Sequence, residues 1–189
     1  MKTLVTVYAD KLDFNYSNAL ILYSITNVAR HYGFKTIIVS EGDMPVFTSD
    51  KVKISSYIHS IPNIIVEKWI RSMNISIMLS ELLHEAGLNE VLCYGVPCLL
   101  AITPIRKIAD IRVVYTPSIA DILALKNDDR LVSETFTELL RHALKYVDLI
   151  FDYELSVKQI MNYKEKELIS TSLVNDPKVL EDFILRGSW

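Results

Sequence analysis

The segment spanning residues 111–153 constrains the fold of this chain most strongly. Two apolar runs, 111–116 (IRVVYT) and 148–153 (DLIFDY), flank an amphipathic stretch at 129–146. Both runs are apolar throughout and do not alternate with polar residues, which is typical of strands buried on both faces of a parallel sheet. The segment therefore predicts a strand, a crossover helix and a second parallel strand.

The same succession of strand and helix runs along the whole chain. We expect strands at 2–8, 35–39, 52–59, 75–79, 96–103, 111–116, 148–153 and 167–174. We expect helices at 18–32, 64–73, 81–93, 129–146, 154–164 and 177–185. No internal repeat or linker interrupts this order. The sequence predicts one α/β domain over residues 1–189, built on a doubly wound, mostly parallel, Rossmann-like sheet with helices on both faces.

Composition narrows the function classes. Half of the 189 residues are hydrophobic and the formal net charge is −3, with a mean hydropathy of +0.23. The apolar surplus fills a doubly covered sheet or leaves an apolar face for a partner. No block of Lys and Arg is present, which disfavours binding to nucleic acid. The chain enters a strand at once and has no apolar run of about 18 residues, so we expect a cytoplasmic protein.

The two cysteines do not form a metal-binding pattern. Cys93 falls in a predicted helix and Cys98 in a predicted strand, and neither has the spacing of a zinc ligand set. We therefore expect two buried free thiols and no metal site.

Polar residues at the ends of the predicted strands are the candidates for ligand binding. In doubly wound sheets the ligand lies beyond the carboxyl ends of the strands. The same residue types are also common helix caps, so a single one of them is weak evidence for ligand binding and the group as a whole is stronger evidence. The candidates are Asp10, Asp13, Asn15, Asn18, Ser40, Glu41, Ser80, Glu81, His84, Thr103, Arg106, Ser118 and Glu154.

Several familiar signatures are absent. The first strand–helix connection (DKLDFNYS) contains no glycine, which argues against a dinucleotide fingerprint or a nucleotide P-loop. Asp10 and Asp13 form a carboxylate pair that suits a divalent cation or plain solvation equally well. His84 suits a general base, or else a surface helix position. Arg106 suits a phosphate contact or a solvated loop.

Residues 61–75 combine apolar side chains with cations. Ile64, Ile65 and Trp69 stand beside Lys68 and Arg71. This pattern fits a helix that rests on acidic lipid at the membrane surface, and it fits a core-facing helix as well.

The order of segments resembles the N-terminal, acceptor-side domain of a retaining GT-B glycosyltransferase. The resemblance covers residues 1–165 and leaves 166–189 as a strand–helix extension. The segments that carry it are 29–42 (ARHYGFKTIIVSEG), 75–82 (ISIMLSEL), 95–105 (GVPCLLAITPI), 111–121 (IRVVYTPSIAD) and 134–161.

This resemblance implies a function and also shows departures from the family. It implies that Asp10, Asp13 and Asn15 contact the hydroxyls of a sugar or lipid acceptor, with Glu81 or His84 near the transferred group. Ser80 and Ser118 stand where the family often has histidine, and the glycine pair after the first strand is missing. The second domain, which in the family binds the nucleotide sugar, has no counterpart in this sequence. The chain would then be a part of a longer enzyme, one half of a split enzyme whose donor domain is a partner chain, or a relative that kept the fold and lost hexosyl transfer.

Two other functions remain open from the residues alone. One is a non-catalytic interaction module that forms a homodimer through its apolar surplus. The other is a Mg²⁺-dependent nucleotide- or phosphate-binding domain that uses Asp10 and Asp13.

Overall fold

The computed structural model describes residues 3–11, 25–41, 50–54, 64–86, 90–118, 130–152 and 168–170. Among the residues predicted to bind a ligand, Asp13, Asn15, Asn18 and Glu154 lie outside these ranges. The helices predicted at 154–164 and 177–185 lie outside them as well.

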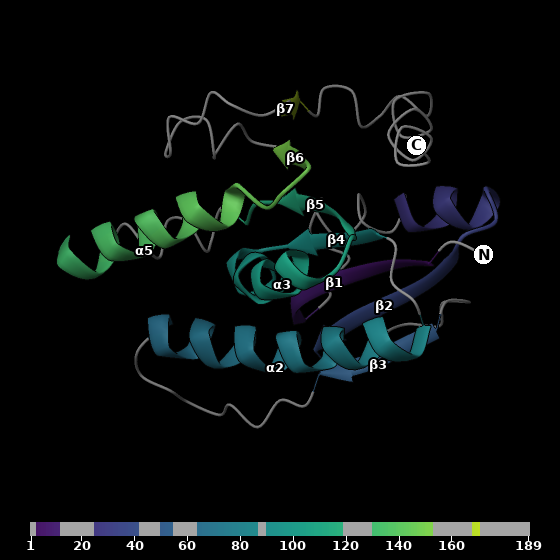
Figure 1. The fold of residues 1–189 in the computed structure, drawn as a ribbon, viewed down its shortest axis with the longest axis horizontal. Helices are drawn as coiled ribbons and strands as arrows, with labels where there is room; N and C mark the ends of the chain where they lie inside the picture. The colour runs from purple at the N-terminus through teal and green to yellow at the C-terminus, as the bar shows by residue number, and fades with distance from the viewer. Residues whose placement is uncertain are drawn as a thin grey trace.

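Seven parallel strands form one sheet in the order β3-β2-β1-β4-β5-β6-β7 (Figure 1). All pairings in this sheet are parallel, which confirms the predicted fold class. The strands are β1 (Thr3–Lys11), β2 (Lys35–Glu41), β3 (Asp50–Ile54), β4 (Glu90–Tyr94), β5 (Arg112–Thr116), β6 (Leu149–Asp152) and β7 (Leu168–Ser170).

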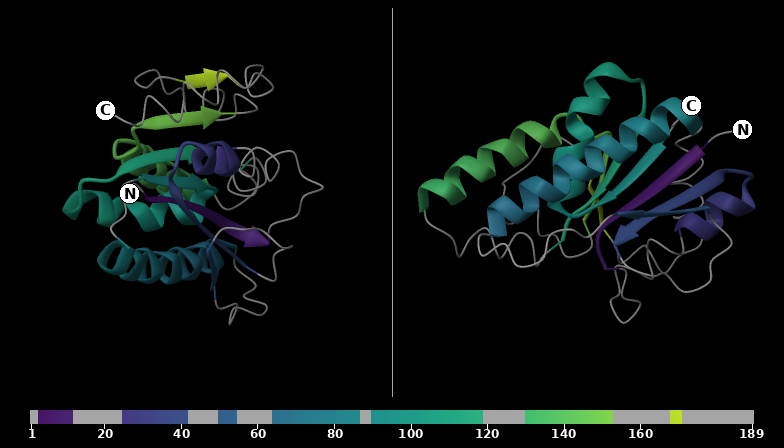
Figure 2. Two further views of the ribbon diagram at one scale, coloured as in Figure 1. Left: turned by 90° about the vertical axis from the view of Figure 1, so that its right-hand side faces the viewer. Right: turned by 90° about the horizontal axis from the view of Figure 1, so that it is seen from below.

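The strand order places helices on both faces of the sheet. From β1 the chain moves outward to β2 and β3, then returns to the other side of β1 for β4 and continues outward to β7. Right-handed crossovers in these two directions put their helices on opposite faces. The helical residues 25–31 cover one face, and α2 (Ile64–Ala86), α3 (Val96–Ile108) and α5 (Arg130–Leu144) cover the other (Figure 2). The expectation of a doubly wound sheet is therefore confirmed.

The strands are apolar throughout because both of their faces are buried. Val113 and Tyr115 belong to the large core cluster under α2, α3 and α5, while Val114 points to the other face, and all three are buried. On that second face, Thr6 and Thr26 form a buried hydrogen bond between their hydroxyls at 3.2 Å. This contact joins β1 to the helical residues 25–31. Both layers of the core thus meet at the central strands.

The first described helix ends as the sequence predicts. Gly33 has a φ of 82°, in the left-handed region that favours glycine at a helix C-terminus. Its N–H donates to the carbonyl of Arg30, and the N–H of Phe34 donates to the carbonyl of Ala29. These two bonds satisfy carbonyls that the helix itself leaves without partners, and β2 begins two residues later.

Two predicted strands and one predicted helix are wrong. Residues 75–79 lie within the long helix α2, and residues 96–103 lie within α3. The helix predicted at 81–93 is helical only as far as 86 and then gives way to β4. Short apolar runs do not distinguish a buried strand from a buried helix. α3 is buried over most of its length, so it shows no polar stripe in the sequence.

Within the described part of the chain, none of the helices is both long enough and apolar enough to cross a membrane.

Candidate functional site

The candidate site is the carboxyl edge of the sheet where β1 and β4 lie side by side. Strand order reverses between these two strands, and ligands of doubly wound sheets bind at such a point. Val7 pairs with Cys93 in register, and Tyr8 pairs with Tyr94. The carboxyl-terminal part of β1 and the turn from β4 into α3 therefore lie side by side at this edge of the sheet.

The turn after β4 is built on Gly95. This residue has a φ of 84° and serves as the N-cap of α3, where a side chain would be strained. Its N–H donates to the carbonyl of Thr116 at 3.0 Å, which ties the turn to the end of β5. Its carbonyl accepts the first backbone hydrogen bond of α3 from Leu99 at 3.3 Å. The turn is thus held to its neighbours by backbone contacts.

The N-cap residue of α3 does not supply a capping side chain. Gly95 provides no side-chain hydrogen bond, the first turn carries no acidic residue, and Pro97 has no N–H to donate. A helix N-terminus carries a partial positive charge and unpaired N–H groups. The first turn of α3 thus places a helix N-terminus at the carboxyl edge of the sheet.

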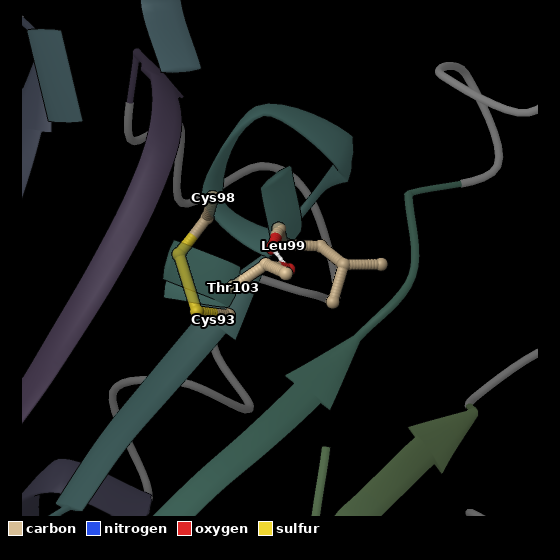
Figure 3. Close-up of a disulfide and its surroundings, with 4 residues drawn as sticks. All are labelled: Cys93, Cys98, Leu99 and Thr103. Atoms are coloured by element: carbon tan, nitrogen blue, oxygen red, sulfur yellow. Dashed lines mark hydrogen bonds between the residues drawn. A yellow bond between two sulfur atoms is a disulfide. The ribbon is translucent and has the colours of Figure 1, made fainter. Parts of the chain in front are cut away.

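A disulfide joins the end of β4 to the first turn of α3. Cys93 and Cys98 have their Cα atoms 5.4 Å apart, and both side chains are fully buried (Figure 3). The prediction of two free thiols, in a helix and a strand respectively, is wrong. The sharp turn through Gly95 reverses the chain, and this reversal brings two cysteines five positions apart into bonding distance.

The end of β5 contributes a buried hydroxyl without a partner. Thr116 is 1% exposed. Among the buried side-chain polar atoms that the structure describes, Thr116 Oγ1 is the one without a hydrogen-bond partner. An unsatisfied buried hydroxyl destabilises a fold by about 1–3 kcal/mol. A ligand that reaches this hydroxyl would supply the missing bond. Ser118, two residues further, is also buried.

Four predicted residues do lie at the carboxyl edge. Asp10 is near the end of β1, Ser40 and Glu41 end β2, and Ser118 follows β5. Because all strands are parallel, their carboxyl ends share one edge of the sheet. For these four, the placement at strand ends is confirmed, while their roles stay predictions.

Ser80, Glu81 and His84 do not lie there. They belong to the last turns of α2, which leads into the amino end of β4. Ser80 is exposed and donates to the carbonyl of Ser76 at 2.8 Å. The expectation that these residues follow a strand and face the crevice is wrong, because α2 returns the chain to the opposite edge of the sheet. Glu81 and His84 are exposed at that edge.

Thr103 and Arg106 are also displaced from the crevice. Thr103 lies within α3 and donates its hydroxyl to the carbonyl of Leu99 at 2.9 Å. Arg106 lies in the last turn of α3, at the amino edge, where its guanidinium pairs with Asp110 at 3.3 Å and Asp148 at 3.6 Å. The expected positions at a strand end are wrong because 96–103 is a helix. Arg106 contributes to structure at the opposite edge.

Gly95, Thr116 and the disulfide were not predicted, although the sequence contains a pattern that indicates the turn on which they depend. Gly95, Thr116 and the disulfide lie in or beside the run CYGVPC and the run VVYTPS. A glycine followed by Val and Pro is typical of a strand end that enters a helix with Pro in its first turn. The described residues contain no group of three His, Cys, Asp or Glu side chains arranged to hold a metal ion. Asp13 lies outside the described ranges, so the Asp10–Asp13 pair stays a prediction.

The fold is shared with several solved structures. A sucrose-phosphate synthase from Thermosynechococcus elongatus matches over 98% of this chain and 94% of that chain, with a TM-score of 0.65 and 9% identity. A second structure of that enzyme matches over 90% of this chain and 48% of its own, with a TM-score of 0.66 and 8% identity. The lipopolysaccharide glycosyltransferase WaaG matches over 88% of this chain and 44% of its own, with a TM-score of 0.52 and 12% identity.

One further match comes from outside the glycosyltransferases. The C-terminal domain of the coenzyme A biosynthesis protein CoaBC matches over 98% of this chain and 93% of that domain, with a TM-score of 0.53 and 14% identity. No protein-family model matches the sequence, and no curated protein matches it either.

These likenesses establish the fold. The chain has the Rossmann-like α/β fold found in GT-B glycosyltransferases, and it spans about half the length of the longer chains it matches.

Proposed function

We propose that this chain is the acceptor-binding half of a GT-B-type glycosyltransferase, with the acceptor held at the carboxyl edge of the sheet between β1, β4 and β5. The observation that carries the proposal is the match of nearly the whole chain to about half of several glycosyltransferase chains. Identity in these matches is low, so the function rests on the fold together with the site.

The chemistry of the carboxyl edge supports an acceptor with hydroxyl groups. Thr116 Oγ1 is buried and lacks a partner, and a sugar hydroxyl both donates and accepts hydrogen bonds. The N-terminus of α3 lies at the same edge and carries the partial positive charge of a helix dipole. Asp10, Ser40 and Glu41 come from the ends of β1 and β2 at the same edge. The proposed ligand is therefore a sugar or a glycolipid acceptor.

Transfer itself requires a donor domain in this proposal. The matched glycosyltransferase chains are about twice as long as the part that this chain covers. The nucleotide sugar would be bound by that other half, which closes over the crevice from a partner chain or from a further segment. Closure would exclude water from the reaction and would bring the donor to the acceptor hydroxyl.

A binding experiment tests this proposal. We would measure the melting temperature of the chain with a panel of monosaccharides, disaccharides and short-chain glycolipids, and separately with nucleotide sugars. At least one acceptor should raise the melting temperature, because a ligand that binds the folded state stabilises it. Nucleotide sugars alone should not. Stabilisation by nucleotide sugars with no response to any acceptor would assign the chain to the donor side instead.

Two matched valine variants test the site. Thr116→Val should weaken acceptor affinity about three- to tenfold, the effect of losing one hydrogen bond. Thr103→Val removes a hydroxyl from α3, away from the carboxyl edge, and should leave affinity unchanged. Equal affinities for wild type and Thr116→Val would remove Thr116 from the site.

A second candidate function is a non-catalytic module that forms a homodimer through α2. Trp69, Met73 and Ile77 recur every four residues on one face of α2 and are 44%, 60% and 60% exposed. The exposed carboxylates Glu81 and Glu85 lie on the same helix, and the net charge of the chain is −3. Because negative charge is repelled by acidic lipid, a second copy of the chain is a better partner for this face than an acidic membrane surface.

Sedimentation equilibrium separates this candidate from the first. A dimer that Met73→Glu converts to a monomer would support the interaction module. Ile108→Glu, at an exposed position on α3, is the control and should leave the dimer intact. A chain that stays monomeric at all concentrations and floats with acidic phospholipid vesicles would favour a membrane contact through α2. A chain that neither dimerises nor binds vesicles would leave acceptor binding as the proposed function.

A further inference from the structure

We propose that the Cys93–Cys98 disulfide is sealed inside the core, so that reductants reach it only when the whole chain unfolds. The bond then needs an oxidant while the chain folds and none afterwards. The folded chain keeps it in a reducing environment as well as in an oxidising one. The inference does not depend on what the carboxyl edge of the sheet binds.

The first cysteine lies on a central strand with a neighbouring strand on either side. Cys93 pairs in register with Val7 of β1 and with Tyr115 of β5. Both partners are buried and belong to the same core cluster as Cys93. Buried side chains therefore close off Cys93 along the sheet in both directions.

The helix that carries the second cysteine covers the bond. Cys98 lies in the first turn of α3, where its neighbours Val96 and Leu99 are also buried (Figure 3). α2 packs against α3 in turn, and its residues Ile75 and Leu79 are fully buried in the same cluster. The disulfide thus lies beneath one helix that is itself packed against another.

The turn between the two cysteines is tied to the rest of the sheet. The N–H of Gly95 donates to the carbonyl of Thr116 at 3.0 Å, and the carbonyl of Gly95 accepts the N–H of Leu99 at 3.3 Å. Because these residues pack into the common core, exposing the sulfur atoms requires α3 to separate from the sheet. Core elements of this kind open with a free energy close to that of global unfolding.

The chemistry of reduction makes this burial decisive. Thiol–disulfide exchange requires a thiolate to approach one sulfur directly. Both cysteines are 0% exposed, so a thiolate does not reach either sulfur in the folded chain. When a buried site reacts only through an open state that recloses quickly, the rate follows the equilibrium population of that state. In this proposal the open state is the unfolded chain.

Formation of the bond belongs to the open chain for the same reason. The two cysteines are five positions apart, and the entropy cost of closing a loop grows with its length. The oxidant is a small disulfide such as oxidised glutathione. One cysteine thiolate attacks it and releases one thiol, and the second cysteine thiolate then attacks the mixed disulfide and releases the other. Two electrons pass to the oxidant, and the two protons from the cysteines end on the released thiols.

The kinetics of reduction test the seal. The chain, refolded with oxidised glutathione, is incubated with dithiothreitol at several urea concentrations below the unfolding midpoint, and free thiols are trapped with iodoacetamide and counted by mass spectrometry. Without urea, reduction should be at least about a thousandfold slower than in the unfolded chain, because the unfolded fraction of a stable domain is about that small. The logarithm of the rate should rise with urea as steeply as global unfolding measured by circular dichroism.

A variant on the other face of the sheet separates global unfolding from local opening. Ile25 is buried among the helical residues 25–31, away from α3. Ile25→Ala should accelerate reduction by the factor by which it raises the unfolded fraction, roughly thirtyfold or more. Ile108→Ala, at an exposed position of α3 itself, is the control and should leave the rate unchanged.

Three results would overturn the proposal. Alkylation of both cysteines in the unfolded chain before any reductant is added would show that the disulfide is absent. A rate of reduction that does not change with urea below the midpoint would show that local opening reaches the bond. The same conclusion would follow if Ile25→Ala lowered stability and left the rate unchanged. If this variant does not fold, the urea series on the wild-type chain still decides the question.

Discussion

Glu90 and Arg112 form an ion pair at the amino ends of β4 and β5, with Arg112 Nη1 2.7 Å from Glu90 Oε1. The two residues are partners in the register of these strands. Their side chains are 7% and 21% exposed. The pair therefore links the two central strands at the edge of the sheet that lies opposite the candidate site.

Removing one member of this pair should destabilise the fold. Arg112→Met keeps most of the side-chain volume but withdraws the charge partner of the buried Glu90. We expect a loss of about 2–4 kcal/mol in the free energy of unfolding, measured by urea denaturation. Removing both charges with Glu90→Gln/Arg112→Met should recover part of that loss. A single variant as stable as wild type would show that the pair contributes little.

Asp148 should contribute through a backbone hydrogen bond. Its Oδ2 accepts the N–H of Val113 at 2.7 Å, and its Oδ1 lies 3.6 Å from Arg106. Asp148→Ala removes both contacts and should lower the free energy of unfolding by about 1–2 kcal/mol. Asp110→Ala is the control, since Asp110 is fully exposed and its ion pair with Arg106 should leave stability nearly unchanged. Equal losses in thermal denaturation would contradict this account.

Two isoleucines of α3 should respond very differently to truncation. Ile102 is fully buried in the core cluster, whereas Ile108 is 83% exposed at the end of the same helix. Ile102→Ala should cost about 2–5 kcal/mol because it removes buried surface and leaves a cavity. Ile108→Ala should change stability by less than about 0.5 kcal/mol. Chemical denaturation of the two variants compares one residue type in one helix.

The hydroxyls of Thr116 and Thr6 should have opposite effects on stability. Thr116 Oγ1 has no partner in its buried position, so Thr116→Val should leave the free chain as stable as wild type, or more stable by up to about 1 kcal/mol. Thr6 Oγ1 pairs with Thr26 Oγ1. Thr6→Val leaves the Thr26 hydroxyl without this bond and should cost about 1 kcal/mol. Differential scanning calorimetry without ligand measures both, and a strongly destabilised Thr116→Val would indicate a hidden partner.

The β5–α5–β6 unit shows what local pattern can predict. Residues 111–116 and 148–153 are apolar on both faces, and the intervening helix has a polar and an apolar side. These periodicities are local, so they determine the strand–helix–strand order whatever surrounds it. The predictions for β1, β2, β5, α5 and β6 are confirmed for this reason.

The stretch from 75 to 103 shows where local pattern fails. α3 is buried among α2, α5 and the sheet, and its first half reads as a continuous apolar run. In α2, Ile75 and Leu79 are buried while Ile77 is exposed, which is a helical spacing hidden inside the apolar run ISIML. Because these two helices were predicted as strands, five residues were predicted at the carboxyl edge of the sheet and do not lie there: Ser80, Glu81, His84, Thr103 and Arg106.

The sequence was enough to establish the fold class, because doubly buried strands and crossover helices impose their own periodicities on the chain. It also placed Asp10, Ser40, Glu41 and Ser118 at the ends of strands. The packing of the elements was needed to establish which segments are helices in the apolar middle of the chain, since burial on all sides erases the period that separates helix from strand. It likewise decided that Cys93 meets Cys98 and that Thr116 is buried without a partner, because both depend on the turn at Gly95 and on how β4 packs beside β5.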